Sequence, residues 1–232
     1  SVAAGLSHTC AVTAVGGVKC WGWNEHGQLG DGTKTNREAP VDVFGLTSGV
    51  KAIAAGWYHT CALTDAGAVK CWGWNATGQL GNGTTTEHAK PVAVVGLSSG
   101  VESITAGESH TCARVADGIK CWGWNLYGQL GNNTTTDHWT PVAVTGLAAN
   151  TEAVAAGRYH TCARMDGGAM KCWGDNSSGQ LGDGTVTDRL APVDVTGLPG
   201  GVESIAAGSH HTCALIESSG GAVCWGLNAY GQ

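Results

Sequence analysis

Cysteine and histidine are the residues of this chain with the greatest chemical potential, and both recur at a fixed spacing. The ten cysteines form two series of five. The first series recurs at intervals of 51, 51, 50 and 51 residues, and each member is followed nine to eleven residues later by a second cysteine and then Trp-Gly. Thiols in such a pattern can form disulfides, bind a metal or pack as free apolar groups.

The residues between paired cysteines vary in number only where a hairpin turn is expected. If the cysteines face each other, the turns have two to four residues, as in 116–117, 65–67 and 217–220, which are common hairpin lengths. Facing strand residues have α-carbons about 4.5 to 5.5 Å apart, within the reach of a disulfide. We predict five cross-strand disulfides, with buried free thiols as the alternative; zinc is disfavoured because no CxxC spacing occurs. The predicted pairs are Cys10–Cys20, Cys61–Cys71, Cys112–Cys121, Cys162–Cys172 and Cys213–Cys224.

A histidine followed by threonine also occurs once in every repeat. A ring of histidines could bind a metal, but a group needed once per repeat is more simply a hydrogen-bonding group between repeats, because buried polar groups need partners. The tryptophan after each second cysteine is expected to pack between repeats. We therefore predict no metal and no cofactor. The residues are His8, His59, His110, His160 and His211, with Trp21, Trp72, Trp122, Trp173 and Trp225.

Acidic and amide residues in Gly-Asp-Gly-Thr segments are a weaker candidate for metal binding. Asp31 and Asp183, with Asn82 and Asn133 as counterparts, have the oxygen ligands that calcium prefers. Asn, Asp and Gly together are more often turn formers, which is the interpretation we adopt. No nucleophile, base and orienting residue form a recognisable set, so we expect a non-enzymatic protein.

Each repeat contains the elements needed to position these residues. In the first repeat, apolar stretches at 1–5, 8–12, 18–22 and 40–43 are separated by turn-forming residues, with a long polar connection before the last. Four strands per repeat of about 50 residues predict an all-β propeller of antiparallel blades. We divide residues 1–232 into repeats 1–51, 52–102, 103–152, 153–203 and a partial 204–232. Because the last lacks a fourth strand, we expect part of a larger propeller, or completion by another chain in head-to-tail contact.

The repeated motifs resemble those of the regulator of chromosome condensation repeat family. They are Gly-x-x-His-Thr, Trp-Gly-x-Asn, Gly-Gln-Leu-Gly and Pro-Val, and they cover the whole chain. The family includes nuclear exchange factors, a plant ultraviolet-B photoreceptor and secreted protein inhibitors, so the resemblance implies the fold and not one function. The cysteine pair in every repeat is similar to that of bacterial, exported members. The photoreceptor string Gly-Trp-Arg-His-Thr is absent, and the nearest match is Gly-Trp-Tyr-His-Thr at 56–60, so photoreception is not expected.

Composition excludes several classes of partner. The net charge is −6, only 13% of residues are charged and no run of Lys or Arg occurs, so nucleic acid is not an expected partner. No stretch approaches the ~20 apolar residues that span a bilayer, so no membrane insertion is expected. Five disulfides require an oxidising compartment, which predicts an extracellular or cell-surface location.

Differences between the repeats gather on one face. The connections between strands one and two and between strands three and four emerge on the same side, where a rigid repeat can present a binding surface. The leading hypothesis is an exported scaffold that binds a protein or cell-surface partner there; relaxed drift of the loops is the plain alternative. Other hypotheses are a carbohydrate-binding module that stacks sugars on Trp57, Tyr58, Tyr127 and Tyr159, and an accessory propeller of a larger exported protein. The candidate binding residues are Trp57, Tyr58, Glu108, Leu126, Tyr127, Arg158, Tyr159, His210 and Tyr230.

Overall fold

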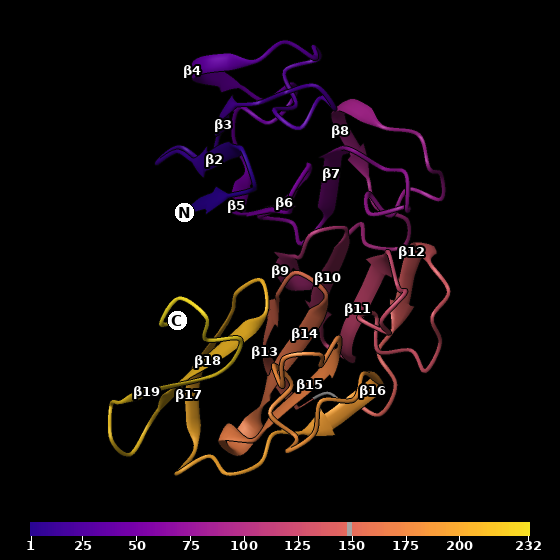
Figure 1. Ribbon diagram of the computed structural model, residues 1–232. Helices are drawn as coiled ribbons and strands as arrows, with labels where there is room; N and C mark the ends of the chain where they lie inside the picture. The colour runs from indigo at the N-terminus through magenta and orange to yellow at the C-terminus, as the bar shows by residue number, and fades with distance from the viewer. Residues whose placement is uncertain (148–149) are drawn as a thin grey trace.

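The computed structural model describes residues 1–147 and 150–232 as five antiparallel sheets that follow one another around a common centre (Figure 1). The first four have four strands each and the last has three. The first two sheets comprise β1 (Val2–Ala4), β2 (His8–Val12), β3 (Val18–Gly22) and β4 (Arg37–Asp42), then β5 (Val50–Ala55), β6 (His59–Thr64), β7 (Val69–Gly73) and β8 (His88–Ala93). The third comprises β9 (Val101–Ala106), β10 (His110–Val115), β11 (Gly118–Gly123) and β12 (His138–Ala143). The last two comprise β13 (Thr151–Ala156), β14 (His160–Met165), β15 (Met170–Gly174) and β16 (Arg189–Asp194), with the 3-10 turn η1 (Asp166–Gly168), then β17 (Val202–Ala207), β18 (His211–Ile216) and β19 (Ala222–Gly226).

Within each sheet the strand order follows the chain, so every blade is an up-and-down meander. The first strands of neighbouring blades contact one another, β1 with β5, β5 with β9, β9 with β13 and β13 with β17, and they form the centre of the arc in Figure 1. This architecture confirms the predicted all-β blades of about 50 residues, the last of them with three strands. Each inner strand from β5 onward begins two residues before the repeat boundary drawn from the sequence.

The fourth strand of each blade is longer than the sequence indicates. In the first blade it begins at Arg37, three residues before Pro40. The pairing with β3 is irregular there, since Cys20 faces Val41 whereas Gly22 faces Arg37. A proline is tolerated here because β4 is the outermost strand, and no further strand pairs with its outer edge and needs an N–H from it.

The hydrophobic core lies between consecutive blades. Between the first and second blades, the buried Cys10–Cys20 pair and Leu29 pack against Trp72 of the second blade, and equivalent clusters follow at the next three interfaces. A Cβ at Gly30 would lie 2.7 Å from the Trp72 indole nitrogen, so this glycine permits the close approach of the two blades. The second Gly of each Gly-Gln-Leu-Gly motif is thus a packing requirement.

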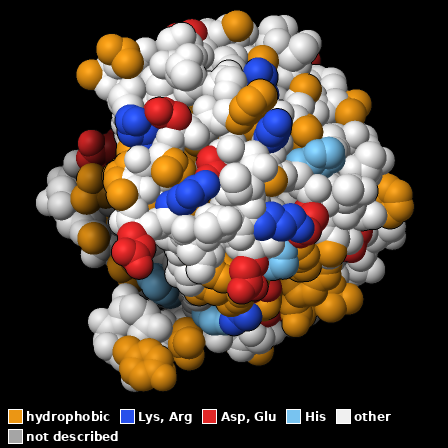
Figure 2. All heavy atoms as spheres, turned by 90° about the horizontal axis from the view of Figure 1, so that it is seen from above, with side chains coloured by type: hydrophobic (Ala, Val, Ile, Leu, Met, Phe, Trp, Pro, Cys, Tyr) orange, Lys and Arg blue, Asp and Glu red, His pale blue; other side chains and the backbone are white. Residues whose placement is uncertain are grey.

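The surface is mostly uncharged. On the side of the molecule shown in Figure 2, Lys and Arg side chains are interspersed with Asp and Glu, without a large patch of one sign. Among residues 1–147 and 150–232, no helix has the length and apolar character needed to cross a bilayer.

Candidate binding face

All five predicted disulfides are present. Each joins residues that face each other on the second and third strands of a blade, with α-carbons 4.1 Å apart. The hairpin turns have the predicted lengths, and Gly67 takes the left-handed conformation expected of it, with φ of 76°. The bonds therefore fix the middle of every blade.

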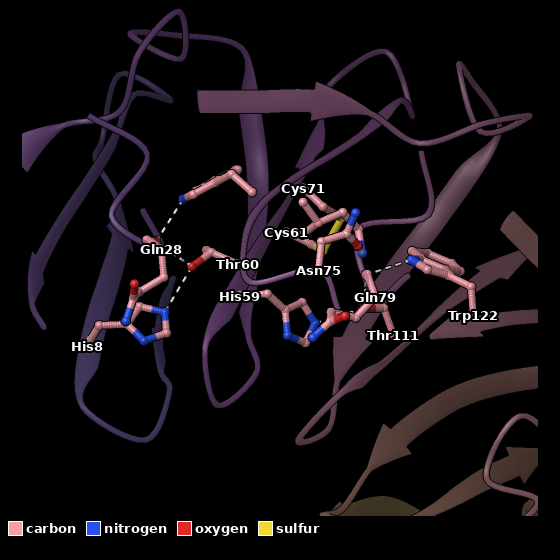
Figure 3. The surroundings of a disulfide bond; sticks show 12 residues. His8, Gln28, His59, Thr60, Cys61, Cys71, Asn75, Gln79, Thr111 and Trp122 are labelled. Atoms are coloured by element: carbon pink, nitrogen blue, oxygen red, sulfur yellow. Dashed lines mark hydrogen bonds between the residues drawn. A yellow bond between two sulfur atoms is a disulfide. The ribbon is translucent and has the colours of Figure 1, made fainter. Parts of the chain in front are cut away.

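Four of the five repeated histidines bond to the next blade. His8 Nε2 is 2.9 Å from Thr60 Oγ1 of the next blade, and that hydroxyl donates to the backbone oxygen of Gln28 at 2.8 Å (Figure 3). A hydroxyl has one proton, so the histidine must be the donor to Thr60, which assigns the proton to Nε2. The same hydrogen bond between neighbouring blades recurs for His59–Thr111, His110–Thr161 and His160–Thr212.

Burial keeps these histidines neutral. A Cβ at Gly5 would lie 2.3 Å from His8 Cε1, which shows how closely the ring packs on the glycine of Gly-x-x-His-Thr. Desolvation lowers the pKa to about 4 for His8 and His160 and to about 3 for His59 and His110. Among the described residues, no three His, Cys, Asp or Glu side chains are grouped as metal ligands.

Four of the five repeated tryptophans bond to the same carbonyl oxygens as these threonines. Trp72 Nε1 donates to the Gln28 oxygen at 2.8 Å, so this oxygen accepts both the indole and the Thr60 hydroxyl of the next blade. Trp122, Trp173 and Trp225 make the equivalent bonds. Each Gly-Gln-Leu-Gly segment thus accepts two hydrogen bonds from the following blade through one backbone oxygen.

The Gly-Asp-Gly-Thr segments form turns, and the counterpart predicted for the third repeat was wrong. Asp31 Oδ1 accepts from the Thr33 backbone N–H at 2.9 Å and from its hydroxyl at 2.7 Å. In the third repeat the counterpart is Asn132 and not Asn133, because Asn125 bonds to Asn132 at the same seven-residue spacing. Asn133 takes the place of a glycine, with φ of 63°.

A cavity of about 310 Å³ lies at the centre of the arc, lined by the small residues that end the inner strands. Its mouth is on the side of the connections between first and second strands and between third and fourth strands, which we call the loop face. The residue after each inner-strand glycine stands at the mouth, one per blade: Leu6, Trp57, Glu108, Arg158 and Ser209.

Three of these mouth residues are joined. The Arg158 guanidinium carbon lies 4.3 Å from the centre of the Trp57 ring and 4.6 Å from that of Tyr159. Arg158 Nε donates to Glu108 Oε2 at 2.6 Å, and the two side chains are 30% and 17% exposed. Burial, followed by the hydrogen bond and charge of Glu108, raises the pKa of the Tyr159 phenol to about 12. The mouth thus presents a guanidinium already held in place.

Aromatic rings extend from this mouth in two groups. The first group is Trp23, His26, Tyr58 and Trp74, with ring centres 5.1 to 6.2 Å apart. The second is Trp124, Tyr127, Tyr159 and His210, at 4.9 to 6.1 Å. Trp57 touches the first group through Tyr58 at 6.3 Å, and Arg158 touches the second through Tyr159. A connected band of rings therefore crosses the loop face.

The structure brings most of the sequence-predicted residues into this band. Leu126 and Tyr230 lie outside it and are 57% and 93% exposed. The candidate set omitted Trp23, Trp74 and Trp124, although their recurrence two residues after the packing tryptophan is visible in the sequence. The band they complete depends on ring contacts between neighbouring blades, such as Trp23 with Tyr58, which the sequence of one repeat does not show.

Comparison with known proteins agrees with this geometry. The sequence profile of the RCC1-like domain matches residues 2–232. The chain belongs to the RCC1-like domain family. This RCC1-like domain is 37% identical over 236 residues to the ultraviolet-B receptor UVR8 of Arabidopsis thaliana and 33% identical over 235 residues to the human probable E3 ubiquitin-protein ligase HERC4. It covers 42% and 18% of their lengths, and all of it is matched.

Solved structures with the same fold are also longer than this RCC1-like domain. Human WBSCR16 superposes with a TM-score of 0.84 at 25% identity, over 94% of this chain and 57% of that one. Yeast RCC1 (Prp20), solved with Kap60 bound, gives 0.83 at 23% identity, over 98% and 56%. The chain therefore spans less than half of the curated relatives and slightly more than half of these solved chains.

Proposed function

We propose that this RCC1-like domain is an exported, non-enzymatic scaffold that binds a protein partner through the mouth of its loop face. The observation that carries the proposal is the Arg158 guanidinium, stacked on Trp57 and paired with Glu108. Tryptophan, tyrosine and arginine are the residue types that dominate binding energy at protein interfaces. Because their positions are fixed before binding, less conformational entropy is lost on association.

Export is supported by the disulfides. Five bonded pairs, with no free cysteine among the described residues, are typical of proteins from an oxidising compartment. In this proposal the bonds stiffen the blades so that loops of different sequence can vary on a constant frame.

The proposal is tested by affinity capture from the surface fraction of the source organism, with wild-type protein, Trp57→Ala and Arg158→Ala as baits. The matched control is Val15→Ala, since Val15 is 77% exposed in the β2–β3 turn at the other end of the strands. We expect a partner retained by wild type and the control to be lost by both mouth variants. Equal capture by all four proteins would contradict the proposal.

Three of the four rings named for sugar stacking are poorly placed for it, which weakens the carbohydrate alternative at those positions. One face of Trp57 and one of Tyr159 are covered by the Arg158 guanidinium. Tyr58 stands edge-on between Trp23 and Trp74. These three rings therefore have little free surface on which a sugar could stack. A sugar site on the loop face would have to use other rings.

A further inference from the structure

A slot on the loop face lies between the tryptophans of the second and third blades. Its cavity of about 180 Å³ is lined by Trp74, Thr77, Glu108, Ser109 and Trp124. Trp74 and Trp124 directly follow the third strands of neighbouring blades, β7 and β11, so the two indoles come from equivalent positions on either side of the slot.

The slot exists because the third repeat has a serine where the repeats on either side of it have a tyrosine. The residue before the repeated histidine is tyrosine in the second and fourth repeats, and Tyr58 occupies the space between Trp23 and Trp74 at 5.1 and 6.1 Å. Tyr159 packs in the same way against Trp124 at 4.9 Å. In the third repeat this position is Ser109, and the space that a tyrosine would fill is open.

Polar groups surround the open space. The Glu108 carboxylate accepts from Arg158 and, with about four acceptor sites, keeps some of them unused. The Thr77 hydroxyl donates to Gln79 and still has lone pairs that can accept. Among the described residues, the Ser109 hydroxyl and the indole N–H groups of Trp74 and Trp124 have no hydrogen-bond partner.

We propose that this slot binds one pyranose ring of a neutral glycan. A pyranose has apolar C–H faces that pack against indoles and a rim of hydroxyls that need both donors and acceptors, which the slot supplies together. A cationic ligand fits less well, because Arg158 already compensates the charge of Glu108. The inference does not rest on the protein-binding proposal, since the slot is formed by Trp74, Ser109 and Trp124 and shares only Glu108 with the mouth.

The test uses the indole N–H signals of Trp74 and Trp124 in ¹⁵N-labelled full chain. Soluble tetrasaccharides of glucose, N-acetylglucosamine, galactose and mannose are titrated in turn, with choline and a proline-rich peptide as competing ligand classes. Pull-down on cellulose, chitin, galactan and mannan separates binding to a polysaccharide from binding to free sugar. The deciding variant is Ser109→Tyr, which places in the slot the residue that two other repeats carry, so the backbone can accommodate it. Ser7→Tyr is the matched control at the equivalent position of the first repeat.

We expect at least one neutral tetrasaccharide to shift both indole signals saturably in wild type and in Ser7→Tyr, and to shift neither in Ser109→Tyr. Trp124→Leu should weaken the binding about two- to tenfold, the loss expected from one stacking ring. The inference is overturned if no tetrasaccharide shifts these signals, if Ser109→Tyr binds as well as wild type, or if only choline or the peptide binds.

Discussion

The hydroxyl of Thr111 connects two blades, because it accepts from His59 Nε2 at 2.9 Å and donates to the Gln79 backbone oxygen at 3.0 Å. His59, Thr111 and Gln79 are all fully buried. Loss of this hydroxyl would therefore leave the buried His59 Nε2–H without an acceptor. It would also remove one of the hydrogen bonds to the buried Gln79 oxygen.

Thr111→Val should destabilise the domain by about 1 to 3 kcal/mol, the cost of leaving such a group unsatisfied in a site where shape is otherwise preserved. Thr111→Ser keeps the hydroxyl and should cost less. Urea unfolding monitored by tryptophan fluorescence measures both. Equal losses for the two variants would mean that the methyl group and not the hydrogen bonds stabilises the interface.

The stability of the domain should fall as the pH is lowered from about 6.5 to 5. The pKa values of His8, His59, His110 and His160 are lowered to between about 3 and 4 in the folded state, so the unfolded chain binds more protons below its ordinary histidine pKa near 6.5. The stabilisation is complete above that value and is lost as the pH falls toward the folded pKa values, at about 2 kcal/mol per histidine by pH 5.

Urea unfolding at pH 7.5, 6 and 5 measures this dependence. Carboxylates contribute little to it, because they titrate mainly below this range. His110→Gln is the control variant, since its amide can still donate to Thr161 but does not titrate, and it should reduce the slope by roughly a quarter. A stability that is constant or rises toward pH 5 would show that the histidines are not held neutral.

The five disulfides should differ in their resistance to reduction. Cys213 is half-buried and Cys224 is exposed, whereas the other eight cysteines are fully buried. Mild reductant followed by alkylation and peptide mass spectrometry should therefore label Cys213 and Cys224 first. Closure of each loop should contribute ~2 to 3 kcal/mol in the chain-entropy model, so complete reduction should unfold the domain. Labelling of a buried pair first would contradict the blade packing.

Tyr159 should ionise at a higher pH than an ordinary tyrosine. Its burial and its contact with Glu108 raise its pKa to about 12. Spectrophotometric titration at alkaline pH, compared with Tyr159→Phe to identify its signal, should place the ionisation of Tyr159 near pH 12, and Glu108→Gln should bring it to lower pH. Ionisation of Tyr159 near pH 10 in the wild-type protein would show that burial and Glu108 do not act on it.

The sequence predicted the blades and the disulfides because both depend on short-range regularity. A cysteine pair separated only by a hairpin turn is positioned by local pairing, and the lengths of the turns at 65–67 and 116–117 followed from it. The start of the fourth strand was misplaced because a bulge between Cys20 and Gly22 shifts the register, and Pro40 was read as a start signal. The place of Asn133 was wrong because adjacent asparagines make the alignment ambiguous.

The binding face was predictable only as a set of residues. The variable positions and the face they share follow from the meander, but contacts such as Arg158 with Trp57, two blades apart, depend on how the blades are arranged around the centre. For the same reason the sequence did not reveal that Tyr58 fills the space between Trp23 and Trp74, or that Ser109 leaves the next such space open. These properties arise between repeats and have no signature within one.

The most direct test of the proposed function is site-specific photo-cross-linking. A photoreactive amino acid is introduced at position 6, at the mouth of the loop face beside the intact Trp57 and Arg158, and separately at position 15, in a turn at the opposite end of the strands. Each protein is irradiated with the surface fraction of the source organism. The proposal predicts a discrete protein adduct from position 6 that is absent from position 15 and disappears when Arg158→Ala is added. Adducts of equal yield from both positions, or an adduct from position 15 alone, would contradict it.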